Sequence, residues 1–289
     1  MQAVRIVTDS VADIPPDLAR KYGIRVVPAY VHFGIRTYRD GVDLTPEEFY
    51  SRLASEKELP KTSQPSPGDF YEAYAEIVET GASIVSIHPS AELTGTYSSA
   101  CLARASLPSA DIEVIDTRYA TMAEGLLAIE AARAARMGLP KAEIVKMIRA
   151  LAERVRFFVS LDSLDFIGRS GRVGKAKVFL ASMLNIKPII TVRNGVIEPL
   201  DRVRGAARVI PRLMEMCQET VKSARVRASV IHAQALNYAT RLKDEVEKRL
   251  HTRVIVADAG PAIVSNAGPG SYGLAIIELP DDHPVQDLQ

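Results

Sequence analysis

The stretch Val4-Arg5-Ile6-Val7-Thr8-Asp9-Ser10 decides the fold class of this 289-residue chain. A short run rich in β-branched residues that ends in polar ones is typical of a buried strand leading into a loop. Further strands are predicted at residues 24–27, 84–87 and 112–115, and helices at 17–22, 69–79 and 97–107. Because strands that alternate with helices form parallel sheets, we predict an α/β fold.

Residues 29–44 interrupt this alternation. Their pattern is that of a hairpin with Gly34 at the turn, and Thr45-Pro46-Glu47-Glu48 then has the cap, proline and acidic residues of a helix start. We therefore expect a small β-hairpin insertion near residues 29–44.

The pattern changes after two predicted helices at residues 121–137 and 141–153. Strands are predicted at 157–160, 188–192, 196–199, 227–231, 253–257 and 273–279, and helices at 202–222 and 239–250. Arg193-Asn194-Gly195 is a hairpin signal, which indicates antiparallel pairing. We expect an N-terminal parallel-sheet, Rossmann-like domain over residues 1–155, a C-terminal mixed or antiparallel α/β domain over 156–289, and a ligand between them.

The composition is that of a globular chain, with 47% hydrophobic and 25% charged residues. Two cysteines are too few for a disulfide framework and lack the spacing of a zinc site, so a reducing compartment, the cytosol, is expected. No apolar run approaches the ~18 residues of a membrane span, and we expect at most transient membrane contact.

Charge is distributed unevenly along the chain. Residues 149–227 hold 16 Lys or Arg and 7 Asp or Glu, although the whole chain has a net charge of only +1. A concentrated positive field attracts acidic partners, but an ordinary solvated surface explains the same count. Nucleic acid is not expected, because aromatic residues do not interleave with the basic ones.

The most informative motif is Ser90-Ala91-Glu92-Leu93-Thr94-Gly95-Thr96, which follows a predicted strand and opens a helix. Free N–H groups at a helix N-terminus attract anions, and the hydroxyls of Thr94 and Thr96 add donors. The alternative is that one hydroxyl only caps the helix.

A second hydroxyl-rich segment is Lys61-Thr62-Ser63-Gln64-Pro65-Ser66-Pro67-Gly68. We interpret it as a loop stiffened by two prolines, which would present Thr62 or Ser63 across a crevice at the strand ends. The alternative is an ordinary proline-rich helix entry.

Enzyme motifs are not evident. Gly268-Pro269-Gly270-Ser271-Tyr272-Gly273 matches a dinucleotide pattern formally, but a strand follows it in place of a helix. No nucleophile elbow occurs, and the five histidines show no recognisable triad or zinc spacing. Asp9 and Ser10 could form a nucleophile pair; we favour the interpretation that they orient loops at the sheet edge, and we expect no catalytic residue and no metal.

The last cluster is basic. Arg169 and Arg172 lie in the glycine-containing segment at residues 166–175, and Arg202 and Arg204 follow. We expect the glycines to leave these arginines exposed, and arginine's planar fork favours recognition of carboxylate or phosphate on a partner.

The order of seven motifs resembles the DegV family over essentially the whole length. These are Ile6-Val7-Thr8-Asp9-Ser10, Tyr38-Arg39-Asp40-Gly41, Thr62-Ser63-Gln64-Pro65-Ser66-Pro67, Leu93-Thr94-Gly95-Thr96, Gly168-Arg169-Ser170-Gly171-Arg172, Asn185-Ile186-Lys187-Pro188 and Gly268-Pro269-Gly270. Each motif is weak alone, and the seven in order are specific.

The resemblance implies a lipid carrier that is not itself an enzyme. It would hold a fatty acid such as palmitate, stearate or oleate in a tunnel between its domains, without a cofactor, and present it to a fatty acid kinase subunit for acyl-phosphate formation. Thr62 and Thr94 would hold the carboxylate, assisted by Ser63 and by the N–H groups of Gly95 and Thr96. Arg169, Arg172, Arg202 and Arg204 are the expected kinase contacts.

One departure from the family concerns Asn266. Members commonly have histidine there, two residues before the Gly-Pro-Gly turn. Asn266 cannot become cationic, although its amide can donate a hydrogen bond to a carboxylate. Two alternatives stay open: a hydrolase or phosphotransferase that uses Asp9, Ser10 and the hydroxyl loops, and a carrier of another carboxylated lipid.

Overall fold

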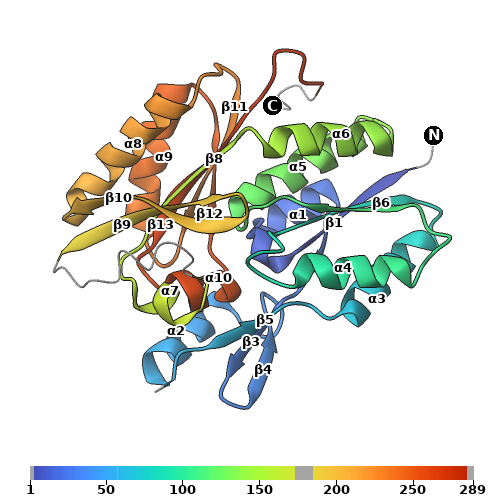
Figure 1. Ribbon diagram of the computed structural model, residues 1–289, viewed down its shortest axis with the longest axis horizontal. Coiled ribbons are helices and arrows are strands. Elements are labelled where there is room, and N and C mark those ends of the chain that lie inside the picture. Colours follow the sequence, from blue (N-terminus) through green and yellow to red (C-terminus); the bar gives the residue numbers. More distant parts are fainter. Residues whose placement is uncertain (1–2, 57, 173–184, 285–289) are drawn as a thin grey trace.

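The computed structural model describes residues 3–56, 58–172 and 185–284, which form three β-sheets with helices between and around them (Figure 1). The first sheet has four strands in the order β2-β1-β6-β7, all parallel. They are β1 (Val4–Asp9), β2 (Arg25–Val27), β6 (Ser83–His88) and β7 (Ile112–Asp116). The parallel sheet predicted from the alternating pattern is confirmed.

Helices cover both faces of this sheet. Apolar side chains of α3 and α4 pack on the face that carries Val7 and Ile84, whereas α5 and α6 pack on the face that carries Ile6 and Val85. The helices of this half are α1 (Pro16–Tyr22), α3 (Pro67–Val78), α4 (Thr96–Ala105), α5 (Met122–Arg136) and α6 (Lys141–Ala152).

The predicted hairpin is confirmed as β3 (Tyr30–Phe33) and β4 (Arg36–Arg39), followed by α2 (Pro46–Ser55) with a complete capping box at Thr45 and Glu48. The small sheet has a third strand, β5 (Lys61–Ser63), which pairs with β3. The prediction that residues 61–68 form only a loop is therefore wrong for residues 61–63. Pairing with β3 overrides the polar composition of β5, and no local pattern encodes that partner.

The second large sheet has the strand order β10-β9-β8-β13-β11-β12, in which only β11 and β12 are parallel. This mixed sheet confirms the second α/β layer predicted from the sequence. Its strands are β8 (Val155–Ser160), β9 (Ile186–Arg193), β10 (Val196–Arg204), β11 (Val226–His232), β12 (Val254–Asp258) and β13 (Tyr272–Glu278).

Each face of the mixed sheet has a different partner. Helices α8 (Val209–Thr220) and α9 (Leu236–Leu250) pack on the face that carries Phe158 and Val230. The opposite face, with Phe157 and Ile231, joins the same apolar core as α5. Helix α5 is buried over residues 122–134, because it lies between the two large sheets (Figure 1).

Three local predictions differ from the structure. The helix predicted at residues 202–222 begins only at Val209, because β10 continues through an irregularity at Pro199 and Asp201 and stays paired with β9 as far as Arg204. The short helices α7 (Asp165–Arg169) and α10 (Pro261–Ala267) were not predicted. Neither is long enough to show a helical period.

The short 3-10 turns η1 (Ser10–Ala12) and η3 (Ala206–Arg208) complete the elements used below. Among the described residues, no helix has the length and hydrophobicity that crossing a bilayer requires.

Candidate functional site

A largely apolar cavity lies where the face of the mixed sheet that carries Phe157 and Ile231 meets the first half of the chain. The space between its walls, counted with the solvent at its mouth, is ≈ 1090 Å³. Strands β8, β9 and β11 supply one wall, and η1, β5 and the loop before α4 supply the other. Aliphatic lining residues include Val11, Leu93, Val159, Ile190, Val192 and Ile263.

Polar side chains that line this cavity come from segments far apart in the chain. Thr62 from β5 and Thr94 from the loop before α4 both line it, with Arg172 and Asn266 from the second half. The sequence analysis placed Thr62, Thr94 and Asn266 at one site, and the structure brings all three to this cavity. The Thr62 hydroxyl has no hydrogen-bond partner within the described ranges, so it remains available to a ligand.

The loop before α4 carries two adjacent hydroxyls. The hydroxyls of Thr94 and Thr96 lie 3.0 Å apart and share a hydrogen bond, and α4 begins at Thr96 with Gly95 as its N-cap residue. A Cβ on Gly95 would come within 2.8 Å of Nε2 of Gln64, the residue that follows β5, so the two segments lie in close contact. The two hydroxyl-rich segments therefore meet at the cavity.

Ser63 has a different environment from Thr62. Its hydroxyl lies 2.9 Å from His32 Nε2, so it is engaged within the small sheet although the residue also lines the cavity. Successive strand residues point to opposite faces, which explains why the neighbours Thr62 and Ser63 differ.

Arg172 also lines this cavity. It is half-buried, and its Nε donates to the carbonyl oxygen of Leu93 at 3.0 Å. Its Nη1 donates to Asn266 Oδ1 at 3.0 Å and to the carbonyl oxygen of Ser170 at 3.2 Å. The prediction that glycines leave this arginine exposed is wrong, because these three internal acceptors hold it against the loop before α4. Partial burial lowers the pKa of the Arg172 guanidinium.

A second, more polar pocket adjoins the cavity and shares Thr62, Arg172 and Asn266 with it. Lys61 and Arg169 also line this outer pocket. Both residues are exposed, so the polar groups at this junction can be reached from the surface.

The other predicted docking residues lie on the surface. Arg202 and Arg204 are exposed on β10, the edge strand of the mixed sheet. They are two residues apart, so their side chains project from the same face of the strand. The remaining basic residue of the 166–175 segment, Lys175, lies outside the described residues.

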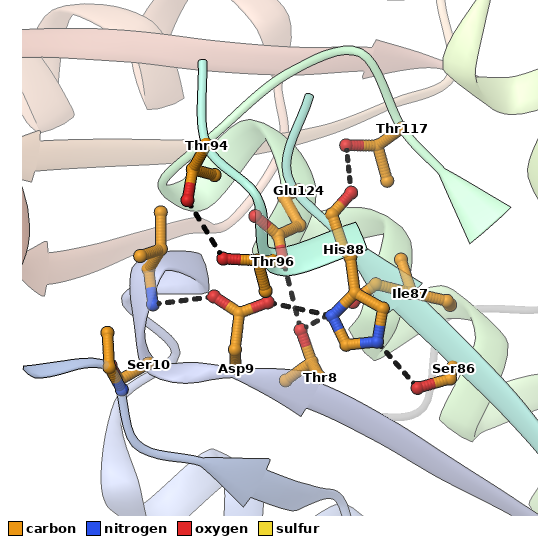
Figure 2. A network of polar contacts seen from close by, with 12 residues as sticks. Thr8, Asp9, Ser10, Ser86, Ile87, His88, Thr94, Thr96, Thr117 and Glu124 are labelled. Carbon is orange, nitrogen blue, oxygen red and sulfur yellow. Dashed lines mark hydrogen bonds and ion pairs between the residues drawn. The ribbon is translucent and has the colours of Figure 1, made fainter. Parts of the chain in front are cut away.

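A buried network lies beneath the loop before α4 (Figure 2). His88 Nδ1 is 2.8 Å from Asp9 Oδ2, and His88 Nε2 is 2.6 Å from Ser86 Oγ, which also accepts a hydrogen bond from Tyr74. These contacts follow the order of a Ser-His-Asp triad, which histidine spacing along the chain did not reveal. Ser86, His88 and Asp9 are fully buried, so no substrate can reach them.

Glu124 of α5 extends this network. Its Oε1 accepts from Thr8 at 3.0 Å, and its side chain is fully buried. Burial and the neighbouring Asp9 carboxylate raise the pKa of Glu124 well above its usual range. Ligand-type atoms of Asp9, His88 and Glu124 lie within 4.8 Å of one another. Asp9 is hydrogen-bonded to His88, whereas Glu124 is bonded to Thr8 and its Oε2 has no hydrogen-bond partner among the described residues.

Two further buried carboxyl groups hold the N-terminus of α10. Asp13 Oδ1 accepts from the Gly260 N–H at 2.8 Å, and Asp40 accepts from the N–H of Ala262. Burial raises the pKa of Asp13 well above its usual range and that of Asp40 to about 6. These contacts fix the helix that carries Asn266 against the first half of the chain.

Asp9 and Ser10, the alternative nucleophile pair, have separate structural partners. Ser10 Oγ donates to Asp40 at 2.8 Å and accepts from the Ala29 N–H at 3.0 Å. Asp9 accepts from His88 and from the N–H of Val11. Both residues thus orient loops at the carboxyl edge of the parallel sheet.

Comparison with known proteins gives consistent matches over the whole chain. The sequence model of a family described as "Uncharacterised protein, DegV family COG1307" matches residues 3–279. A DegV domain-containing protein of Caldanaerobacter subterraneus is 35% identical over 276 residues, which are 95% of this chain and 98% of that protein.

Solved structures are similar as well. A DegV family protein from Thermus thermophilus, described for its fatty acid binding, has a TM-score of 0.91 and 32% identity, with 96% of this chain and 100% of that one covered. A stearic acid-binding protein from Eubacterium ventriosum has a TM-score of 0.87 and 28% identity, with 96% and 98% covered.

Proposed function

Because this chain belongs to the DegV family, we propose that it binds one long-chain fatty acid in the cavity between the mixed sheet and the first half of the chain. The observation that carries the proposal is the combination of an aliphatic cavity with hydroxyl, amide and guanidinium groups in its lining. An amphipathic molecule with a long tail and a small anionic head matches that combination. The fatty acid binding described for the Thermus thermophilus relative supports it.

The energetics favour recognition by the tail. Burial of each methylene contributes ~0.8 kcal/mol, so a long acyl chain supplies on the order of 10 kcal/mol before the cost of immobilising it is subtracted. A few donors then suffice to fix the head group. Neither large sheet closes the cavity alone, and we propose that the chain divides into two domains near residue 155 with the lipid between them.

We assign the head group to the polar lining. The hydroxyls of Thr62 and Thr94 would donate hydrogen bonds to the carboxylate. The N–H groups of Gly95 and Thr96 at the start of α4 would add further donors. Arg172 joins this set, in place of the docking role predicted from sequence, because its guanidinium lines the cavity. Ser63 would act indirectly, through His32 and the position of β5.

The outer pocket supports a second step in the proposal. Since it opens the polar end of the cavity to the surface between Lys61 and Arg169, a bound carboxylate would be accessible to an enzyme that modifies it. We propose that the chain presents its fatty acid to a fatty acid kinase subunit for acyl-phosphate formation. Arg169, Arg202 and Arg204, which are exposed, would contact that subunit.

Native mass spectrometry tests the carrier function. The chain purified from cells should carry the mass of one fatty acid per molecule, and the acid should be released on denaturation. An empty chain that also fails to take up added palmitate contradicts the proposal. If a different carboxylated lipid is found at the same stoichiometry, the proposed binding site is supported but its ligand is that lipid.

The docking proposal needs a separate test. Arg169→Glu combined with Arg204→Glu should lower phosphorylation of bound palmitate by a fatty acid kinase subunit at least tenfold without changing palmitate affinity. Lys248→Glu on α9 is a control for the loss of an exposed positive charge. Unchanged phosphorylation in the double variant contradicts the docking proposal and leaves lipid binding untouched.

A further inference from the structure

Arg172 and Asn266 are in contact at the cavity, and the role of this contact in lipid binding rests on the proposed function. The guanidinium of Arg172 has five N–H donors. Protein acceptors take three of them, on Leu93, Ser170 and Asn266. Both N–H groups of Nη2 have no acceptor in the described part of the chain, and no acidic side chain there pairs with the guanidinium.

A cation that is half-buried without an anionic partner is costly, because it loses part of its hydration without compensation. This cost is recovered when an anion binds. Since Arg172 lines both the apolar cavity and the outer pocket, the anion expected there is the head group of the bound lipid.

Asn266 determines where this guanidinium lies. Its Oδ1 accepts from Arg172 Nη1 at 3.0 Å, while its Nδ2 donates to the carbonyl oxygen of Ala262 at 2.8 Å. The opposite orientation of the amide would place its NH2 group against the guanidinium and its oxygen against the Ala262 oxygen. Both contacts would be repulsive, so these partners fix the orientation.

We propose that Asn266 is a positioning residue that acts on the lipid carboxylate through Arg172. Its oxygen holds Nη1, and this leaves the two N–H groups of Nη2 for the head group. The amide thus contributes its acceptor to Arg172, where the sequence predicted a donor to the carboxylate. A permanently charged guanidinium, held by a neutral side chain, then supplies the charged hydrogen bond at this site.

Two ligands with the same tail isolate this effect. Palmitate and 1-hexadecanol both have sixteen carbons, and only palmitate has an anionic head. Asn266→Ala should lower the preference for palmitate over hexadecanol about tenfold, as expected for loss of a well-placed charged hydrogen bond. The preference is obtained from the two dissociation constants, measured by displacement of a fluorescent fatty acid.

A double-mutant cycle shows whether Asn266 acts through Arg172. In an Arg172→Ala background, Asn266→Ala should cause no further loss of preference. Ser265→Ala is the matched control, because Ser265 neighbours Asn266 and also donates to a carbonyl oxygen four residues earlier, that of Pro261. It should keep the wild-type preference.

The outcomes separate the two proposals. Equal losses from Asn266→Ala with and without Arg172, or an equal loss from Ser265→Ala, overturn the positioning role and leave fatty acid binding intact. A wild-type chain that binds neither ligand overturns the proposed function itself.

Discussion

Gly125 of α5 packs directly against the backbone of Ala12: a Cβ built on this glycine would come within 2.5 Å of the Ala12 carbonyl oxygen. The contact joins the helix between the two large sheets to the turn η1, whose Val11 lines the cavity. Even the smallest side chain at position 125 would push this turn away.

We therefore predict that Gly125→Ala destabilises the protein. Alanine in a helix normally gains about 1 kcal/mol over glycine, but overpacking a core costs about 1–3 kcal/mol, so the net change should be a loss. Denaturant unfolding measures it. Gly68→Ala in α3, where the nearest atom to the added Cβ would be Ser66 Oγ at 3.5 Å, should be neutral or stabilising. A stabilised Gly125→Ala variant contradicts the close packing.

The buried Asp40 predicts a pH dependence of stability. Its pKa is raised from 3.8 to about 6 in the folded chain, so the folded state holds this proton more tightly than the unfolded state. The free energy of unfolding should fall as pH rises from 4 to 6, by up to about 3 kcal/mol from this group. Asp13 and Glu124, whose pKa values are also raised, contribute with the same sign, beginning as pH rises through their unfolded pKa values.

The Asp40→Asn variant isolates that contribution. Its unfolding free energy should lose this part of the pH dependence. The stability of the variant relative to the wild type should therefore increase as pH rises from 4 to 6. Parallel pH profiles for the two proteins would mean that Asp40 ionises with its ordinary pKa. The measurement is chemical denaturation of lipid-free protein at several pH values.

The buried Ser86–His88–Asp9 contacts should serve stability and not catalysis. His88→Ala leaves the Asp9 carboxylate buried without this partner, at an expected cost of about 3–5 kcal/mol in unfolding free energy. Esterase activity toward a chromogenic ester should stay at background in the wild type and in Ser86→Ala. An esterase activity that disappears in Ser86→Ala would instead mean that Ser86, His88 and Asp9 act as a catalytic triad.

The cavity lining should set the length of the bound acyl chain. Ala233, a buried residue that lines the cavity beyond the end of β11, leaves room for the tail, and Ala233→Phe should shift the preferred fatty acid to fewer carbons. Val159→Ala enlarges the same cavity and should shift it toward longer chains. Competition among saturated acids of 10 to 18 carbons measures both shifts. If the two variants show the same chain-length preference, the tail lies elsewhere.

Much of the fold could be predicted from sequence, because the strands of the parallel sheet and the capping box at Thr45 are local patterns. The strand β5 could not, since its partner is distant in the chain. The same limit applies to the site. Thr62 and Thr94 were recognisable from hydroxyl-rich motifs, whereas the inward position of Arg172 depends on acceptors at Leu93 and Asn266.

A crystal structure of the chain grown with palmitate shows whether the two threonines hold the carboxylate of the bound acid. We expect one carboxylate within about 2.7–3.2 Å of the hydroxyl oxygens of Thr62 and Thr94, with the tail running along the mixed sheet past Val159 and Ile190. A palmitate whose carboxylate lies away from both threonines, or an empty cavity at saturating lipid, would contradict the account.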